Sequence, residues 1–115
     1  MKSTQTKHEL AKWYRKLVSV KESRAGLRRL ASNVADAISN KNIPANDGAN
    51  IMWCIWERLN QPAYLSPFVG LASEYRDYEF LQKYTAKEEL PHIIHNKVEC
   101  LNDIINYSIK ISSQK

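Results

Sequence analysis

The sequence predicts an all-α protein with about five helices packed in a single compact domain over residues 1–115. Three glycines and four prolines are few interruptions for a chain of this length. Alternating apolar and polar stretches of the strand type are missing, and apolar residues instead recur every three or four positions. A chain of 115 residues fits one domain that buries roughly 65 per cent of its unfolded surface.

The first helix is predicted in the N-terminal segment, where two sets of residues share the spacing of helix faces. The core-facing set is Leu10, Trp13, Tyr14 and Leu17. The set beside it is Lys12, Arg15, Lys16 and Ser19. A basic ridge is therefore expected next to a buried seam.

The second helix is predicted over residues 23–40, with Ser23 as its N-cap. Its buried stripe is predicted to hold Leu27, Leu30 or Ala31, Val34 and Ile38. Lys21, Arg24 and Arg28 lie on another stripe, so the helix begins with positive charge. Because the helix dipole disfavours cations at that end, these charges are interpreted as serving something other than helix stability.

The third helix is expected to be short and central, from Ile51 to Leu59, since apolar residues occupy most of its sides. Before it, residues 42–48 are predicted to form a loop, because Pro44 fixes the backbone and Asn-Asp-Gly favours a turn.

The last two helices follow a break at residues 61–67. Ser66 and Pro67 are typical of an N-cap and first helical position, opening a helix that runs towards Tyr84. The inner face of that helix is predicted to hold Phe68, Leu71, Ala72 and Tyr75. Residues 85–88 fit a capping box for the last helix, with either a kink or a late start at Pro91. Its predicted buried stripe is Ile94, Val98, Leu101, Ile105 and Ile109.

Positive charge is concentrated at the N-terminus of the chain. Residues 1–29 contain nine Lys and Arg but two acidic side chains, whereas the other 86 residues contain eight basic and ten acidic ones. Such segregation predicts a surface that attracts polyanions. RNA or DNA backbone is the favoured partner, with non-specific and salt-dependent binding, because no helix-turn-helix or zinc-finger spacing is present to read bases. The predicted nucleic-acid-binding residues are Lys12, Arg15, Lys16, Lys21, Arg24, Arg28 and Arg29.

Two alternative interpretations of the sequence involve protein partners in place of nucleic acid. One is a small helical inhibitor, such as an immunity or anti-defence protein, whose anchors would be Trp53, Trp56 or Tyr78. A homo-oligomer is compatible with the charges, because the acidic cluster at 74–79 would meet the basic ridge of another copy. The alternative for that cluster, which is favoured, is that it only solvates its own helix.

No catalytic site or cofactor is predicted. Glu88, His92, His95 and Glu99 have the spacing of one helix face that would hold zinc or iron. The Glu-x-x-His step occurs once, however, and a polar face is ordinary on an amphipathic helix, so no metal is predicted. Cys54 and Cys100 lie in apolar surroundings and are interpreted as reduced core residues. Nucleophile, Walker and dinucleotide motifs are missing, so the chain is not expected to be an enzyme. Without an apolar leader or a membrane-spanning run, it is expected in the cytoplasm.

Residues 8–17 read His-Glu-Leu-Ala-Lys-Trp-Tyr-Arg-Lys-Leu, and residues 23–32 read Ser-Arg-Ala-Gly-Leu-Arg-Arg-Leu-Ala-Ser. This stretch resembles the opening of the small helical subunit of type I-E CRISPR Cascade complexes, over about a quarter of the chain. The resemblance implies an all-α, non-catalytic subunit that helps to hold RNA and target DNA through basic side chains. Carried over to this chain, Arg24, Arg28 and Arg29 match the basic run of that family.

Overall fold

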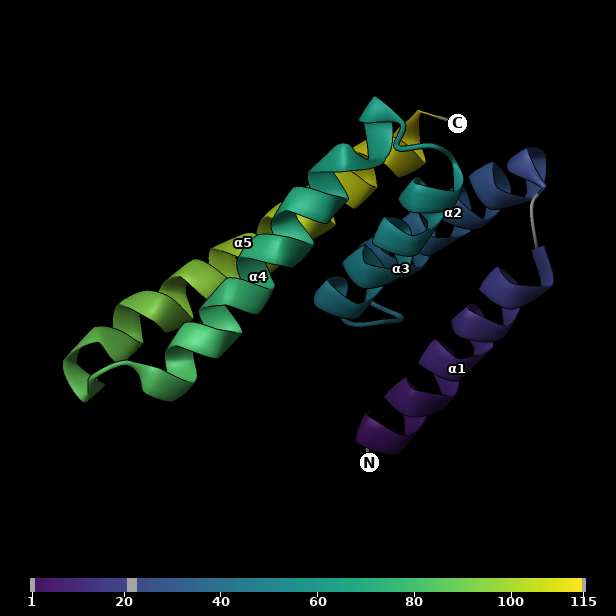
Figure 1. Ribbon diagram of the computed structural model, residues 1–115. Helices are drawn as coiled ribbons and strands as arrows, with labels where there is room; N and C mark the ends of the chain where they lie inside the picture. Colours follow the sequence, from purple (N-terminus) through teal and green to yellow (C-terminus); the bar gives the residue numbers. More distant parts are fainter. Residues whose placement is uncertain (1, 21–22, 115) are drawn as a thin grey trace.

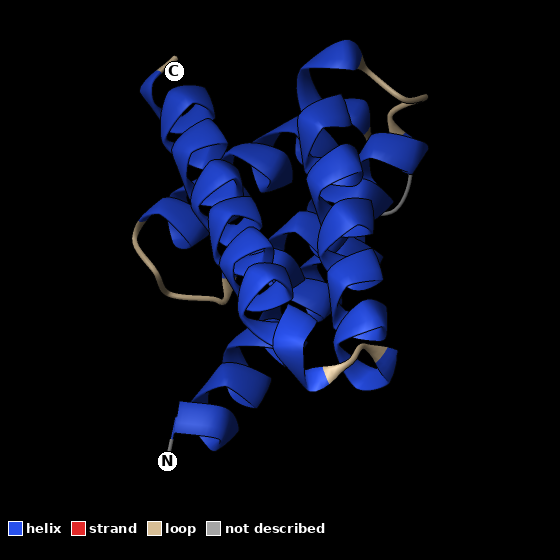
Figure 2. Cartoon of the chain, turned by 90° about the vertical axis from the view of Figure 1, so that its left-hand side faces the viewer, coloured by secondary structure: helices blue, strands red, loops and turns tan. Residues whose placement is uncertain are grey.

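A computed structural model describes the backbone of residues 2–20 and 23–114, and the side chains of residues 7–19 and 23–114. These ranges contain five α-helices and no strand (Figure 2), which confirms the all-α fold class. The helices are α1 (Lys2–Val20), α2 (Arg24–Ser39), α3 (Ala45–Arg58), α4 (Ser66–Tyr84) and α5 (Leu90–Ser113). Short 3₁₀ turns, η1 (Ala63–Leu65) and η2 (Lys87–Glu89), precede α4 and α5.

The helices form three layers (Figure 1). α4 and α5 make a long antiparallel hairpin on one side, α2 and α3 lie in the middle, and α1 covers the opposite side. Among the described residues, α1 packs against α2 and α3 but not against α4 or α5. The hairpin extends past α2 and α3, so its tip lies far from α1 in a molecule that measures 48 × 34 × 24 Å.

The core lies where the α2–α3 layer meets the hairpin. Val34, Ile51, Phe68 and Ile104 are each fully buried there, one from each of the four helices. The Phe68 ring makes an edge-to-face contact with Tyr107, with ring centroids 5.1 Å apart. The Tyr107 hydroxyl in turn donates to the carbonyl oxygen of Tyr64, at 2.6 Å. This chain of contacts joins η1 and α4 to α5.

The predicted start and buried face of α2 are confirmed. The backbone N–H of Gly26 donates to the Ser23 side-chain oxygen at 3.1 Å, as expected of an N-cap. The buried side of this helix contains all of the predicted positions, namely Leu27, Leu30, Ala31, Val34 and Ile38.

The predicted loop at residues 42–48 is wrong in its second half. α3 begins at Ala45, so Asn-Asp-Gly lies in the first turns of a helix. Lys41, with φ of 60°, makes the turn instead. Gly48 is required for packing, because a Cβ atom there would lie 2.4 Å from Cγ1 of Ile38. Glycine at position 48 is therefore explained by the close contact between α2 and α3, and not by a turn.

The predicted N-cap of α4 and the predicted capping box before α5 are wrong, whereas the late start of α5 at Pro91, one of the two predicted alternatives, is confirmed. Ser66 is the first residue of α4 and makes no capping bond; its hydroxyl accepts from Trp56 Nε1 at 3.1 Å and donates to the Pro62 carbonyl at 3.3 Å. Thr85 ends α4 by donating to the Leu81 carbonyl, so no capping box forms. α5 starts late, at Leu90, which places Pro91 in its first turn, where a missing N–H costs nothing.

The predicted buried stripe of α5 is displaced. The buried residues are Ile93, Cys100, Ile104 and Ser108. Of the predicted stripe, Leu101 and Ile105 are partly buried against the core, whereas Ile94, Val98 and Ile109 are close to half exposed. α5 therefore has two neighbouring stripes, the predicted one and the one that contains Ile93 and Ile104. Packing against α4 and α2 buries the second, which the sequence pattern did not favour.

The last turn of α1 is held by a side chain of α3. Arg58 Nη1 donates to the carbonyl oxygen of Leu17 at 2.7 Å, which satisfies one of the acceptors that a helix end leaves without a partner. The positive charge also suits the negative end of the helix dipole. Arg58 of α3 therefore helps to fix the position of α1, which among the described residues packs only against the middle layer.

Replacing Arg58 with Met is expected to lower the free energy of unfolding by about 1.5 kcal/mol, because the part-buried Leu17 carbonyl loses a charged donor while the aliphatic stem is kept. Urea unfolding followed by tryptophan fluorescence would measure this. Lys83→Met, an exposed change on α4, is the control and should remain within about 0.5 kcal/mol of the parent. Equal stability of the two variants would contradict the assigned role of Arg58.

Candidate nucleic-acid interface

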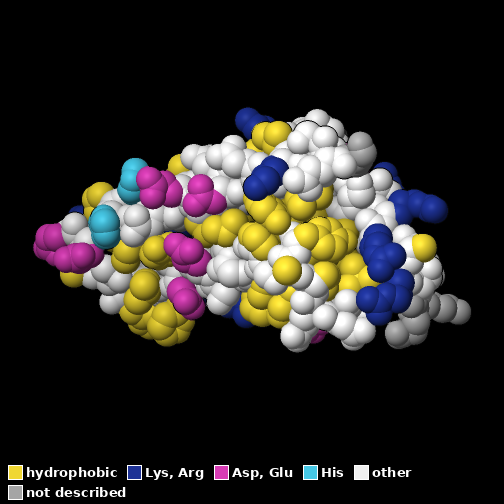
Figure 3. Space-filling model, turned by 90° about the horizontal axis from the view of Figure 1, so that it is seen from above, with side chains coloured by type: hydrophobic (Ala, Val, Ile, Leu, Met, Phe, Trp, Pro, Cys, Tyr) yellow, Lys and Arg dark blue, Asp and Glu magenta, His cyan; other side chains and the backbone are white. Residues whose placement is uncertain are grey.

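Six of the seven predicted nucleic-acid-binding residues are described, and all six are exposed. They are Lys12, Arg15 and Lys16 on α1, and Arg24, Arg28 and Arg29 on α2. Lys21 lies outside the described residues. Figure 3 shows Lys and Arg side chains gathered towards one end of the molecule, and Asp, Glu and His side chains gathered towards the other. We call the described residues of α1 and of the first turns of α2, residues 7–19 and 23–29, the basic end.

The cations of the basic end are not neutralised within the described part of the chain. The ion pairs found among the described residues join Lys97 to Glu79, at 3.9 Å, and His95 to Glu99, at 3.2 Å. Both belong to the α4–α5 hairpin. The six exposed cations are therefore available to an external anion.

Two of the predicted residues lie together in a groove between α1 and α2. The lining of this α1–α2 groove is Lys16, Ser19, Gly26, Arg29, Leu30 and Asn33, and its volume is about 220 Å³. Lys16 Nζ lies 4.5 Å from the centroid of the Trp13 ring, a distance typical of a cation–π contact. Trp13 itself is only 6% exposed, so it positions Lys16 and is not available to stack on a base.

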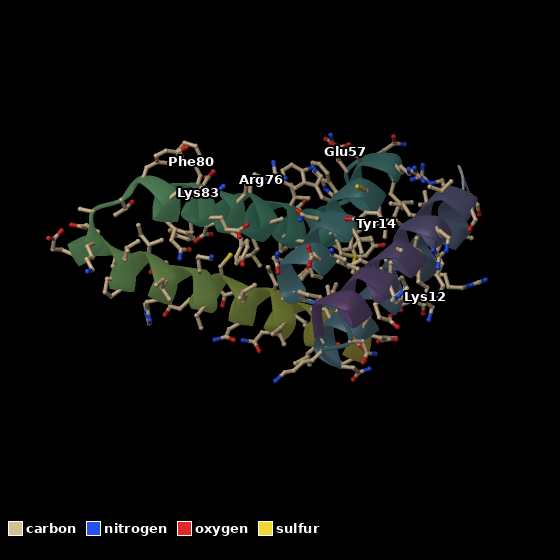
Figure 4. The ribbon with its side chains drawn as sticks, turned by 90° about the horizontal axis from the view of Figure 1, so that it is seen from below. Lys12, Tyr14, Glu57, Arg76, Phe80 and Lys83 are labelled. Atoms are coloured by element: carbon tan, nitrogen blue, oxygen red, sulfur yellow. The ribbon has the colours of Figure 1, made fainter. Side chains whose placement is uncertain are left out.

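The other predicted residues face different directions. Arg28 lies towards Tyr64, whose phenol has a pKa raised by burial and partly lowered again by this guanidinium. Neighbouring positions on a helix differ by about 100°, which is why Arg28 does not join Arg29 in the groove. Arg15 lines a separate hollow on α1 with Tyr14, Val18 and Ser19. In Figure 4, Lys12 and Tyr14 point to different sides of α1.

Sequence reasoning placed Ser19 on the basic ridge without a binding role, and it did not single out Asn33; both line the groove. Ser19 and Asn33 add a hydroxyl and an amide beside the two cations. The Ser19 hydroxyl donates to the Lys16 carbonyl at 3.0 Å, so the Asn33 amide is the group that would donate to a phosphate. The signal was spacing: Ser19 follows Lys16 by three residues, and Asn33 follows Arg29 by four. Each is therefore one helical turn from a cation, on the same side of its helix.

The histidine face of α5 does not gather a ligand set. His95 pairs with Glu99, and His92 Nε2 lies 3.5 Å from the side-chain nitrogen of Asn96. Within the described ranges, no group of three or more His, Cys, Asp or Glu side chains has the arrangement of a metal site.

The two cysteines differ from each other. Cys100 is buried as predicted, and its thiol donates to the Leu71 carbonyl at 3.1 Å. Burial, with help from Glu74 and Asp103, raises the pKa of this thiol to about 11, so it is protonated and unreactive at neutral pH. The prediction of a core position is wrong for Cys54, which is exposed on α3. The apolar run around it faces the core with Ile51, Met52 and Ile55 instead.

Comparison with protein-family models, curated proteins and solved structures gives no match to this chain. Each helix in the described residues is too short or too polar to cross a bilayer.

Proposed function

We propose that this protein is a non-enzymatic, nucleic-acid-associated module that contacts the backbone of RNA or DNA through its basic end. One observation carries the proposal: six exposed cations lie on two adjacent helices, and no carboxylate of the described residues pairs with them. A surface that was basic only for solubility would have its charges interspersed with acids.

The α1–α2 groove is the centre of the proposed contact. Lys16 and Arg29 lie on its two sides, so one phosphate between them would receive a charge from each helix, with the Asn33 amide as a further donor. Arg28 and Arg24 extend the positive surface along α2 to neighbouring phosphates. Contacts of this kind hold the backbone without reading bases.

The setting proposed is a larger cytoplasmic ribonucleoprotein, of which this chain is one helical subunit. Support comes from the resemblance in residues 8–32, which implies a CRISPR effector complex, and from the way in which basic residues of that stretch line the groove. The neighbouring genes would be a direct check on that setting.

Charge reversal in the groove tests the proposal. Lys16→Glu with Arg29→Glu is expected to weaken binding of a fluorescent 20-nucleotide single-stranded RNA or DNA by at least about tenfold at about 50 mM salt, measured by anisotropy. If about four phosphates are contacted, log Kd should rise with log salt with a slope of about 3 for the parent, and the variant should show a smaller slope.

A matched control has the same change in net charge at the other end of the molecule. Lys83→Glu with Lys87→Glu changes two exposed cations near the end of the α4–α5 hairpin and should alter affinity by less than about threefold. Equal losses in both double variants would mean that net charge alone attracts the nucleic acid. No loss in the groove variant would exclude the groove as the binding surface.

The alternative function, a protein-binding inhibitor, was expected to use Trp53, Trp56 or Tyr78. Each of these side chains is partly buried and already has an intramolecular partner. Trp53 lies under Arg76 at 5.1 Å, Trp56 donates to Ser66, and Tyr78 donates to Glu74 at 3.2 Å. More exposed aromatic side chains occur elsewhere, on the end of the hairpin.

A further inference from the structure

The end of the α4–α5 hairpin has an apolar surface that the proposed function does not use. Phe80 is 62% exposed, Leu81 45% and Tyr84 74%. These positions lie on one face of α4, and Asp77 precedes them on the same face by three, four and seven residues. The rings of Phe80 and Tyr84 touch each other, with centroids 4.9 Å apart. In Figure 4, Phe80 points outward from α4. We call Asp77, Phe80, Leu81 and Tyr84 the hairpin surface.

Exposed acidic side chains outnumber the exposed cations Arg76, Lys83, Lys87 and Lys110 along the α4–α5 hairpin. In Figure 3 they lie along the same half of the molecule as an apolar group, at the end opposite the basic residues. The exposed acids of this half are Glu74, Asp77, Glu79, Glu88, Glu89, Glu99 and Asp103. An exposed aromatic pair beside acids is complementary to a surface with exposed apolar groups beside cations.

Such a surface exists on the same chain, at its other end. On α1, Val18 is 69% exposed and Tyr14 43% exposed. They line a shallow, largely apolar hollow of about 470 Å³ together with Arg15 and Ser19. We call these four residues the α1 surface. It offers an apolar floor beside a cation, which is the complement of aromatic rings beside a carboxylate.

One copy cannot join its own two surfaces. α1 lies on the opposite side of the α2–α3 layer from the hairpin, and within the described residues the two make no contact (Figure 1). The complementary surface must therefore come from another molecule.

We propose that the hairpin surface of one copy docks on the α1 surface of a second copy, head to tail. Phe80 and Tyr84 would enter the hollow against Val18, and Asp77 would pair with Arg15. The two surfaces are different, so the pair as a whole keeps one unused surface of each kind, and further copies add to either end.

This self-association does not depend on nucleic-acid binding. The α1–α2 groove opens beside Lys16, which faces α2, and it shares only Ser19 with the α1 surface, so docking at Val18 leaves Lys16 and Arg29 open to a phosphate. The contact area is small, since few exposed apolar residues take part. Its dissociation constant is therefore expected to be on the order of 100 μM, as for transient contacts.

Two single variants separate the two surfaces. Phe80→Lys places a cation on the hairpin surface, and Val18→Glu places an acid on the α1 surface, both at exposed helical positions. In sedimentation equilibrium without nucleic acid, the mean mass of the parent should rise with concentration towards about 1 mM. Each variant alone should stay at the monomer mass, and circular dichroism should show that both keep the parental fold.

Mixing the two variants gives the decisive measurement. Val18→Glu protein keeps an intact hairpin surface, and Phe80→Lys protein keeps an intact α1 surface, so an equimolar mixture should regain association. A mixture that stays monomeric would overturn the proposal. A Val18→Glu variant that still associates alone would show a symmetric contact between hairpins and would also overturn it, as would a parent that stays monomeric throughout.

A last comparison keeps the two proposals apart. The groove variant, Lys16→Glu with Arg29→Glu, should associate like the parent to within about threefold. If it loses RNA binding but keeps association, both proposals stand. If the parent associates but binds no nucleic acid, only the proposed function fails. If the groove variant becomes monomeric, the docking surface is not the one assigned to Tyr14, Arg15 and Val18.

Discussion

Replacing Phe68 with Ala is expected to lower the free energy of unfolding by about 4 kcal/mol, the largest effect of any single change considered. Phe68 is fully buried and contacts Tyr107 edge to face, so its removal leaves a cavity between α4 and α5. Because small domains are stable by about 5–15 kcal/mol, the variant should be close to unfolding at 37 °C. Urea unfolding at 25 °C, followed by circular dichroism, would measure the loss.

Phe68→Leu is the matched control, since it keeps most of the volume and loses only the ring contact with Tyr107. It should cost less than about 2 kcal/mol. If alanine cost no more than leucine, the site would not be the packed junction that the contacts indicate.

Two glycine-to-alanine changes in helices are expected to have opposite signs. At Gly48 the new Cβ atom would lie 2.4 Å from Cγ1 and 2.6 Å from Cδ1 of the buried Ile38 side chain. At Gly70 it would meet nothing within 4 Å. Gly48→Ala should therefore lose about 2 kcal/mol through overpacking, even though alanine favours a helix. Gly70→Ala should gain about 0.7 kcal/mol, because alanine restricts the unfolded chain.

Urea unfolding of both variants beside the parent would check this pair. The double variant Gly48→Ala with Ile38→Val removes the Cδ1 atom and should recover part of the loss. A stabilising Gly48→Ala would mean that α2 and α3 are not in close contact at this point.

Local signals in the sequence predicted much of the fold. The Ser23 cap, the buried stripe of α2 and the inner face of α4 were all found, because each depends on side chains within one helix. Errors arose where a local signal competed with a contact between helices or with a second local signal. Asn-Asp-Gly favours a turn in isolation, but the space beside Ile38 requires Gly48 within α3. Thr85 has the composition of an N-cap, yet its hydroxyl closes the preceding helix.

The candidate interface was predicted as a set of residues, without its arrangement. Helical spacing placed Lys16 on the basic ridge of the first helix and Arg28 on that of the second, but it could not show that Lys16 and Arg29 line one groove. Arg29 was not assigned to either ridge, yet it is the arginine that lines the groove, whereas Arg28 lies towards Tyr64. On the hairpin, the half exposure of Ile94 and Val98 follows from the length by which α4 and α5 extend past the middle layer.

The sequence by itself determined the helical class, the composition of each helix face and the segregation of charge. These follow from chain order and from a period of 3.6 residues, which fixes the angles between side chains on one helix. Only the tertiary structure decided which of two apolar stripes of α5 is buried, and which cations share a groove. The rotation of each helix about its own axis is set by its neighbours, because burying one stripe excludes another and the choice depends on the whole core.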